Sequence, residues 1–107
     1  MFKSVQSADQ VLKESTGRRV MVLKHSSACP SSAYAKREVE KYLAAQGDID
    51  IYLVVVQDQR GISNDLAEKL GVRHESPQLI VIKDGRAENA ISHYSITEAG
   101  IRKLLGL

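Results

Sequence analysis

The only cysteine of the chain, Cys29, lies in a short polar segment between an apolar stretch and an amphipathic one. It is followed directly by Pro30, a residue that suits the first position of a helix. A strand that ends before a Cys-Pro step places the thiol at a helix N-terminus, where unpaired backbone N–H groups and the helix dipole stabilise an anion. The thiolate is the nucleophilic form of cysteine. The sequence therefore predicts a reactive Cys29, with Pro30 opening the helix behind it.

Three neighbours of Cys29 have side chains that can tune its thiol. Lys24 and His25 lie just upstream, where a positive charge would favour the thiolate. Ser32 follows three residues later, a spacing at which side chains meet on a helix, so its hydroxyl is expected to approach the sulfur. For His25 the alternative is a solvated or hydrogen-bonded ring with no catalytic role.

The absence of a second cysteine limits the chemistry of Cys29. An intramolecular disulfide is impossible, and Ser32 cannot resolve a mixed disulfide. The thiol would attack an external disulfide, become linked to it, and wait for a second, external thiol to release it. The alternative is an inert cysteine, since free cysteine is among the most buried residue types.

Composition bounds the class of protein. A chain of 107 residues with 43% hydrophobic and 26% charged residues is expected to form one globular domain over 1–107. Its 15 basic and 13 acidic residues are scattered and it has no Trp, which argues against a nucleic-acid partner. The first fifteen residues include Lys3, Asp9 and Lys13, so neither a signal peptide nor a membrane span is expected. The sequence thus favours a monomer in the reducing cytoplasm.

The elements that must position Cys29 alternate between strand and helix patterns. Ser7 and Gln10 form a capping-box pattern, Asp84-Gly85 is a hairpin turn, and Thr97 caps a last helix with Ile96 packing on Ile101. The predicted strands cover 2–5, 19–23, 49–56, 79–82 and 87–94, and the predicted helices run from Ser7 to near Gly17, from Pro30 to before Gly47, up to Gly71, and from Thr97 onward.

The predicted order is β-α-β-α-β-α-β-β-α. This order is typical of the α/β class, with a central mixed sheet, helices on both faces, parallel pairing from the crossovers and one antiparallel strand from the hairpin. Active groups of open α/β sheets collect at the carboxyl ends of strands, and Cys29 follows one. The fold and the position of the thiol agree.

Two separated motifs resemble the thioredoxin fold. Ala28-Cys29-Pro30-Ser31-Ser32 lies where that superfamily carries its Cys-x-x-Cys motif, with Ser32 in place of the second cysteine. Ser76-Pro77 resembles the cis-proline that precedes the strand before the last hairpin. The resemblance implies a cis Ser76–Pro77 peptide beside Cys29, whose flanking backbone pairs with an extended substrate. Otherwise Pro77 would be an ordinary edge-strand or turn proline.

Within that superfamily the chain is similar to the monothiol bacilliredoxin family. Family members commonly read Thr-Cys-Pro-Ile-Ser, so Ala28 and Ser31 depart from the pattern beside the cysteine. The similarity covers Lys24-His25-Ser26, Cys29-Pro30, Ile62-Ser63-Asn64, Val72 to Gln78, and Ser92 to Thr97.

The resemblance implies a substrate class. Cys29 would remove bacillithiol from S-bacillithiolated client proteins, with bacillithiol or another external thiol as co-substrate and no bound cofactor. Carboxylates of the malate moiety of bacillithiol would be bound by residues of the second half of the chain, because arginine forks match carboxylates. The candidates are Arg60, Asn64 and Arg73, and the alternative is that they are ordinary surface or capping residues. His74 is a further candidate for substrate binding, and the alternative for it is a hydrogen-bonded or solvated ring.

Two other functions remain open on sequence grounds. Monothiol glutaredoxins carry bridged iron–sulfur clusters on a similar fold, but their Cys-Gly-Phe-Ser motif is replaced here by Cys29-Pro30-Ser31-Ser32. His25 and Cys29 are four residues apart without a second cysteine, so no metal site is predicted. The third possibility is a catalytically silent binding module on the same scaffold.

Overall fold

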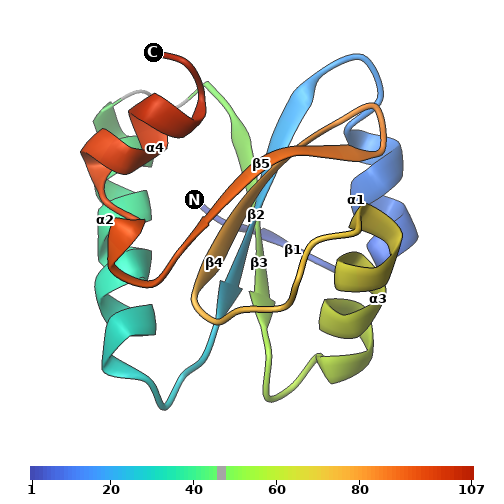
Figure 1. Ribbon diagram of the computed structural model, residues 1–107, viewed down its shortest axis with the longest axis horizontal. Helices are drawn as coiled ribbons and strands as arrows, with labels where there is room; N and C mark the ends of the chain where they lie inside the picture. The colour runs from blue at the N-terminus through green and yellow to red at the C-terminus, as the bar shows by residue number, and fades with distance from the viewer. Residues whose placement is uncertain (46–47) are drawn as a thin grey trace.

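The computed structural model describes residues 1–45 and 48–107, which form a five-stranded mixed sheet between two layers of helices (Figure 1). Figure 1 shows α2 and α4 on one side of the sheet and α1 and α3 on the other. The strands are β1 (Lys3–Ser4), β2 (Arg19–His25), β3 (Asp50–Val55), β4 (Gln78–Lys83) and β5 (Arg86–Ser92), and the helices are α1 (Ala8–Glu14), α2 (Pro30–Ala45), α3 (Arg60–Leu70) and α4 (Glu98–Leu104), with one 3-10 turn, η1 (His93–Ser95).

The strand order is β1-β3-β2-β4-β5, with β2 in the centre. Strands β1, β2 and β3 are parallel, as the crossover helices predict. The prediction that the hairpin strand runs antiparallel to the rest is wrong in one respect: the reversed strand is β4, which is antiparallel to both β2 and β5. The segment 71–77 returns the chain past α3, so that Gln78 opens β4 opposite Lys24 at the carboxyl end of β2.

The alternation of side chains along β2 divides the core in two. Met21 and Leu23 pack in a cluster with residues of α2 and α4, whereas Val20 and Val22 pack in a second cluster with residues of α1 and α3. All four are fully buried. Strand β2 is two residues longer than predicted, so Lys24 and His25 continue the same alternation toward opposite faces.

Local capping follows the sequence closely. The hydroxyls of Ser7 and Thr97 accept the backbone N–H groups of Gln10 and Gly100, as expected of N-caps. Gly71 ends α3 in the left-handed region, as predicted. The predicted end of the second helix before Gly47 lies outside the described residues. None of the helices described is long and apolar enough to span a membrane.

The last predicted strand is too long. β5 ends at Ser92, because His93 takes a positive φ of 54° and the next residues form η1 instead of extended chain. The His93 N–H then donates to the Pro77 carbonyl at 3.0 Å. The turn after β5 is therefore attached to the segment that precedes β4.

Candidate thiol active site

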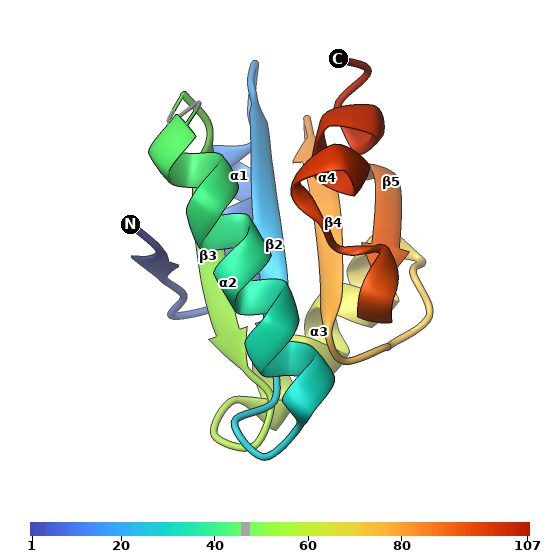
Figure 2. The ribbon, with the colours of Figure 1, turned by 90° about the vertical axis from the view of Figure 1, so that its left-hand side faces the viewer.

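Cys29 lies at the junction between the loop after β2 and the first turn of α2. Its carbonyl accepts the N–H groups of Ser32 at 3.1 Å and Ala33 at 3.2 Å, and its own N–H donates to Ser26 at 3.3 Å. The residue thus occupies the capping position of the helix that Pro30 opens. The thiol is partly exposed. Figure 2 shows this junction at one end of the molecule, beside the loop that leads from β3 to α3.

The sulfur is surrounded by hydrogen-bond donors. Its Sγ lies 2.9 Å from the Ser31 hydroxyl oxygen, and when the thiol is ionised only the hydroxyl of this pair can donate. The Ser31 hydroxyl is the largest cause that lowers the pKa of Cys29, followed by the backbone N–H groups of Ser32 and Ser31, while partial burial opposes them. Hydrogen bonds to the charged form favour that form. The arrangement stabilises a thiolate.

The sequence predicts that the Ser32 hydroxyl approaches the Cys29 sulfur, but in the structure its main hydrogen bond is to another group. Ser32 is fully buried, and its Oγ accepts the Ser26 N–H at 3.1 Å, so it holds the loop after β2 against α2. Its side chain is the least of the contributions that lower the pKa of Cys29. As predicted, the Ser32 hydroxyl does contribute to lowering the pKa of Cys29, but it contributes less than Ser31, which was not among the predicted tuning residues. The departure from the family pattern at Ser31 was the available indication.

A side chain absent from the sequence predictions, Gln57, ties the loop of Cys29 to the loop after β3. Its Nε2 donates to the Ser26 hydroxyl at 2.7 Å, and its Oε1 accepts the Ser27 N–H at 3.3 Å. Both loops lie at the carboxyl ends of parallel strands, which is why one amide side chain reaches across. The loop that presents the thiol is therefore anchored on two sides.

Lys24 does not reach the sulfur. It is fully buried on the α3 side of the sheet, where its Nζ donates to the Ser63 carbonyl at 3.0 Å and lies 3.2 Å from His74 Nδ1. Burial lowers the pKa of Lys24 to about 8. Strand alternation turns the Lys24 side chain to the face opposite α2, so it makes no direct contact with Cys29, and an effect of its charge on the thiol stays a prediction.

His25 lies on the α2 side of the sheet but supplies no counter-charge to the thiol. Burial is the largest cause that lowers its pKa, and the charge of Lys36 lowers it further. The ring is therefore mostly neutral at pH 7. Its Nδ1 is buried and has no hydrogen-bond partner among the described residues.

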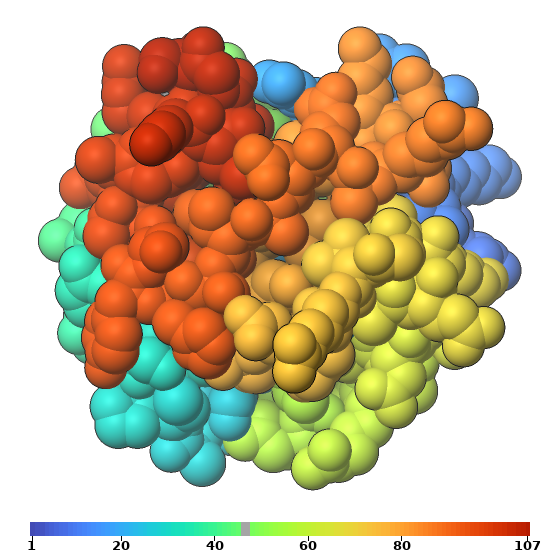
Figure 3. All heavy atoms as spheres, viewed as in Figure 1, coloured from blue at the N-terminus to red at the C-terminus, as the bar shows by residue number. Residues whose placement is uncertain are grey.

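The Ser76–Pro77 peptide bond is cis, the isomer that the sequence predicts. Pro77 is buried and directly precedes Gln78, which pairs with Lys24 at the carboxyl end of β2. In Figure 3 the gold segment before β4 lies just above the teal start of α2, in the lower half of the view. The cis-proline segment and the Cys29 loop therefore share one end of the sheet, and direct contact between them stays a prediction.

The four residues predicted to bind substrate, three of them through its carboxylates, differ in where they lie. Arg60 lies close enough to His74 to lower the pKa of that ring, after burial and Lys24. Asn64 is exposed one turn beyond Arg60 on α3, whereas Arg73 contributes its carbonyl, which accepts Gln78 Nε2 at 2.9 Å. Arg60 therefore contributes a positive charge near His74, whereas Asn64 and Arg73 are exposed and the structure gives no side-chain hydrogen bond between either of them and His74.

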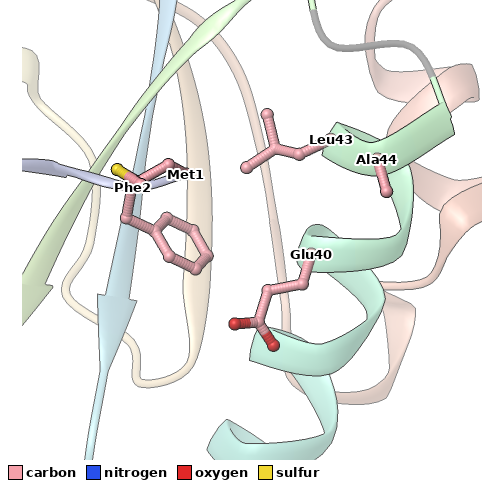
Figure 4. A pocket seen from close by; sticks show the side chains of 5 residues that line it. All are labelled: Met1, Phe2, Glu40, Leu43 and Ala44. Atoms are coloured by element: carbon pink, nitrogen blue, oxygen red, sulfur yellow. The ribbon is translucent and has the colours of Figure 1, made fainter.

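Two features lie apart from the thiol. An open groove between the N-terminus and the later turns of α2, shown in Figure 4, is lined by Met1, Phe2, Glu40, Leu43 and Ala44. It lies along the half of α2 remote from Pro30. Across the described part of the chain, no three His, Cys, Asp or Glu side chains group as a metal site would require.

Comparison with known proteins gives a family and a fold. The model of the family described as monothiol bacilliredoxin BrxC matches residues 1–101. A solved structure described as a candidate oxidoreductase with a thioredoxin fold is 34% identical, with a TM-score of 0.84 over 95% of this chain and 91% of that one.

Two thioredoxins show the same fold at low identity. Fasciola hepatica thioredoxin is 19% identical, with a TM-score of 0.74 over 98% of this chain and 97% of its own. Trypanosoma brucei brucei thioredoxin is 14% identical, with a TM-score of 0.76 over 100% of this chain and 93% of its own. These likenesses confirm the α/β fold class predicted from the order of elements.

Proposed function

The chain belongs to the monothiol bacilliredoxin family of thioredoxin-fold oxidoreductases, and from this membership we propose that it removes bacillithiol from S-bacillithiolated proteins through Cys29. One observation carries the assignment of the nucleophile. The sulfur lies at the first turn of α2 with a hydroxyl at 2.9 Å and backbone donors around it, which is the setting of an activated thiolate.

The reaction proceeds by two thiol–disulfide exchanges. The Cys29 thiolate attacks the bacillithiol sulfur of the client's mixed disulfide; a Cys29–bacillithiol bond forms, the client–bacillithiol bond breaks, and the client cysteine leaves as a thiolate that takes up a proton. An external thiol, bacillithiol itself or another reductant, then attacks the adduct. This second exchange gives a small-molecule disulfide and restores the Cys29 thiolate.

Residues around Cys29 position the thiol and bind the client protein and the bacillithiol moiety. Pro30 fixes the start of the helix behind the thiol, and the backbone at Ser76 and Pro77 pairs with the extended client segment. His74 and Arg60, with Asn64 and Arg73 at the rim, bind the carboxylates of the malate moiety. We propose a monomer that acts in the cytoplasm with no bound cofactor.

Transfer of bacillithiol is tested by intact mass. Reduced protein is incubated with a client peptide carrying a bacillithiol mixed disulfide, and in parallel with the same peptide carrying glutathione. The expected result is an adduct of one bacillithiol on the wild type and none on Cys29→Ser. If neither substrate gives an adduct, the proposed enzymatic activity is overturned and the binding-module alternative remains. If the glutathione peptide gives equal transfer, only the preference for bacillithiol is overturned.

A further inference from the structure

A buried ammonium group lies behind the site without a carboxylate partner. Lys24 is fully buried, and no ion pair involves it within the described part of the chain. Its Nζ has two partners, the Ser63 carbonyl at 3.0 Å and His74 Nδ1 at 3.2 Å. Burying a charge without a counter-charge is unfavourable, and an apolar side chain of similar volume would avoid that cost. Because the buried ammonium group of Lys24 lowers stability, we infer that it has a role in function.

The contact with Lys24 fixes the proton of His74. An ammonium group has donors and no acceptor, so the Nδ1 atom it contacts must carry a lone pair. The Ser63 hydroxyl, 3.4 Å from the same nitrogen, is also placed to donate. Since a neutral imidazole carries one proton, that proton is on Nε2. His74 is consequently a donor on the side of the ring that faces away from Lys24.

The surroundings keep this donor neutral and in a positive environment. Burial, Lys24 and Arg60 each lower the pKa of His74, and Glu75 opposes them. His74 is exposed at the surface and stands three residues before Pro77, at the end of the sheet that carries the Cys29 loop. A fixed N–H donor in the positive field of Lys24 and Arg60 suits an anionic acceptor.

We propose that Lys24 is a positioning residue that holds His74 in its Nε2–H tautomer, so that His74 donates to a malate carboxylate of bacillithiol while the thiol reacts with Cys29. This inference rests on the proposed function for the identity of the ligand. It assigns the buried lysine to substrate recognition and not to tuning of the thiolate.

The tautomer is tested without any substrate. Ring nitrogen chemical shifts of His74 in isotopically labelled protein are expected to show a bare Nδ1 and a protonated Nε2. Lys24→Met keeps the side-chain length without a donor, and is expected to shift the ring toward a mixture of tautomers. A His74 ring that is protonated on Nδ1 in the wild type, or unchanged in Lys24→Met, would overturn the positioning role whatever the protein acts on.

Recognition is tested with two substrates that differ only in the malate. One client peptide carries bacillithiol and the other carries cysteinyl-glucosamine, which lacks the carboxylates. For Lys24→Met and His74→Leu, kcat/KM on the bacillithiol peptide is expected to fall about tenfold, mainly through KM, because a charge-assisted hydrogen bond is lost. On the malate-free peptide the kcat/KM of both variants should equal that of the wild type. His74→Gln, which keeps a side-chain N–H, should retain most of the discrimination.

The outcomes separate this inference from the proposed function. If kcat/KM of Lys24→Met falls equally on both peptides, Lys24 has only a structural role and its proposed role in recognition is overturned. If the wild type transfers both thiols at the same rate, the carboxylate contact is wrong while the exchange chemistry stands. If the wild type transfers neither, the proposed function fails together with the ligand assignment. Thermal unfolding of each variant confirms that it is folded before rates are compared.

Discussion

At the scale of single residues, the reactivity of Cys29 depends on which hydroxyl reaches its sulfur. Ser31 Oγ lies 2.9 Å from Sγ, whereas the Ser32 hydroxyl accepts the Ser26 N–H in the anchored loop. The two serines are adjacent in the chain but differ in function, since the Ser31 hydroxyl makes the largest contribution to lowering the pKa of Cys29 and the Ser32 side chain the smallest.

We expect Ser31→Ala to raise the pKa of Cys29. Ser31 is the largest cause that lowers this pKa, and removing a hydrogen bond to the charged form disfavours that form. The thiolate fraction at a given pH below the midpoint therefore falls, and the midpoint of the rate profile moves to higher pH. Thiolate absorbance at 240 nm, followed against pH, measures the change. Ser27→Ala is the matched control, and an equal shift in both variants would contradict the assignment.

The second residue-scale prediction concerns the stability cost of Lys24. Its pKa is lowered from 10.5 to about 8 in the folded protein, so the unfolded chain binds more protons between these values and stability rises with pH there. Below pH 8 the full penalty is present, roughly 3 kcal/mol for a shift of this size. Lys24→Met removes the charge, and at pH 7 its unfolding midpoint is expected at a urea concentration equal to or higher than that of the wild type.

The pH dependence provides the control for Lys24→Met. Urea unfolding of both proteins at pH 7 and pH 10 isolates the lysine, because every other titrating group is common to the two. The advantage of the Met variant should shrink as the pH rises from 8 to 10. A Met variant that is less stable than the wild type at pH 7, by about 2 kcal/mol or more, would show that the ammonium contacts outweigh the desolvation cost.

At the scale of elements, most of the fold was predictable because its determinants are local. Ser7, Pro30, Gly71 and Thr97 mark helix ends by backbone chemistry that any tertiary context preserves. The end of β5 was not predictable in this way. His93 adopts a positive φ while its N–H bonds to the Pro77 carbonyl, a contact between segments distant in sequence.

The same distinction explains what was missed at the site. Cys29 and its place at a helix start follow from a short run of residues, and the fold class follows from the order of elements. The reversed direction of β4 and the burial of Lys24 depend on sheet pairing, which spacing along the chain does not determine. Gln57 was missed because its partners, Ser26 and Ser27, belong to another loop.

Gly100, in the first turn of α4, tests the junction between η1 and that helix. A Cβ at this position would collide with the Ser95 backbone carbonyl, which cannot move aside as a flexible side chain could, and would also crowd the Thr97 hydroxyl. Gly100→Ala is therefore expected to destabilise the protein by about 1–3 kcal/mol, despite the better helix propensity of alanine.

Gly61, in the first turn of α3, is the matched control for Gly100. A Cβ there meets nothing within 4 Å, so Gly61→Ala should be neutral or stabilising by up to about 1 kcal/mol. Urea unfolding of both variants measures whether the free energy of unfolding falls for Gly100→Ala and not for Gly61→Ala. If the two substitutions change the free energy of unfolding alike, helix propensity and not the contact with Ser95 governs the junction.

At the scale of the whole molecule, the central strand β2 serves two networks on opposite faces of the sheet. Its carboxyl end leads through an anchored loop to Cys29 and α2 on one face. On the other face Lys24 reaches Ser63 and His74, just ahead of the cis-proline segment. Both networks start from the carboxyl end of β2, where Gln78 of β4 pairs with Lys24, so the Cys29 loop and the proposed carboxylate donors lie toward one end of the sheet.

The last prediction follows from the single cysteine of the chain. With no second thiol, the Cys29–bacillithiol adduct of the wild type should persist until an external thiol is added. Ser32→Cys supplies an internal thiol, and the Ser32 side chain is already near enough to contribute to lowering the pKa of Cys29. This variant is expected to expel bacillithiol by attacking the Cys29 sulfur, forming an internal disulfide, with the released thiolate taking up a proton.

Intact mass against time distinguishes the two behaviours of the adduct. The wild-type adduct should keep its mass, while the Ser32→Cys adduct should lose bacillithiol without added reductant and end as an oxidised protein. A wild-type adduct that decays at the same rate as the variant would mean that release needs no second thiol. The two-step mechanism would then be wrong, because its second step requires a thiol that the chain does not possess.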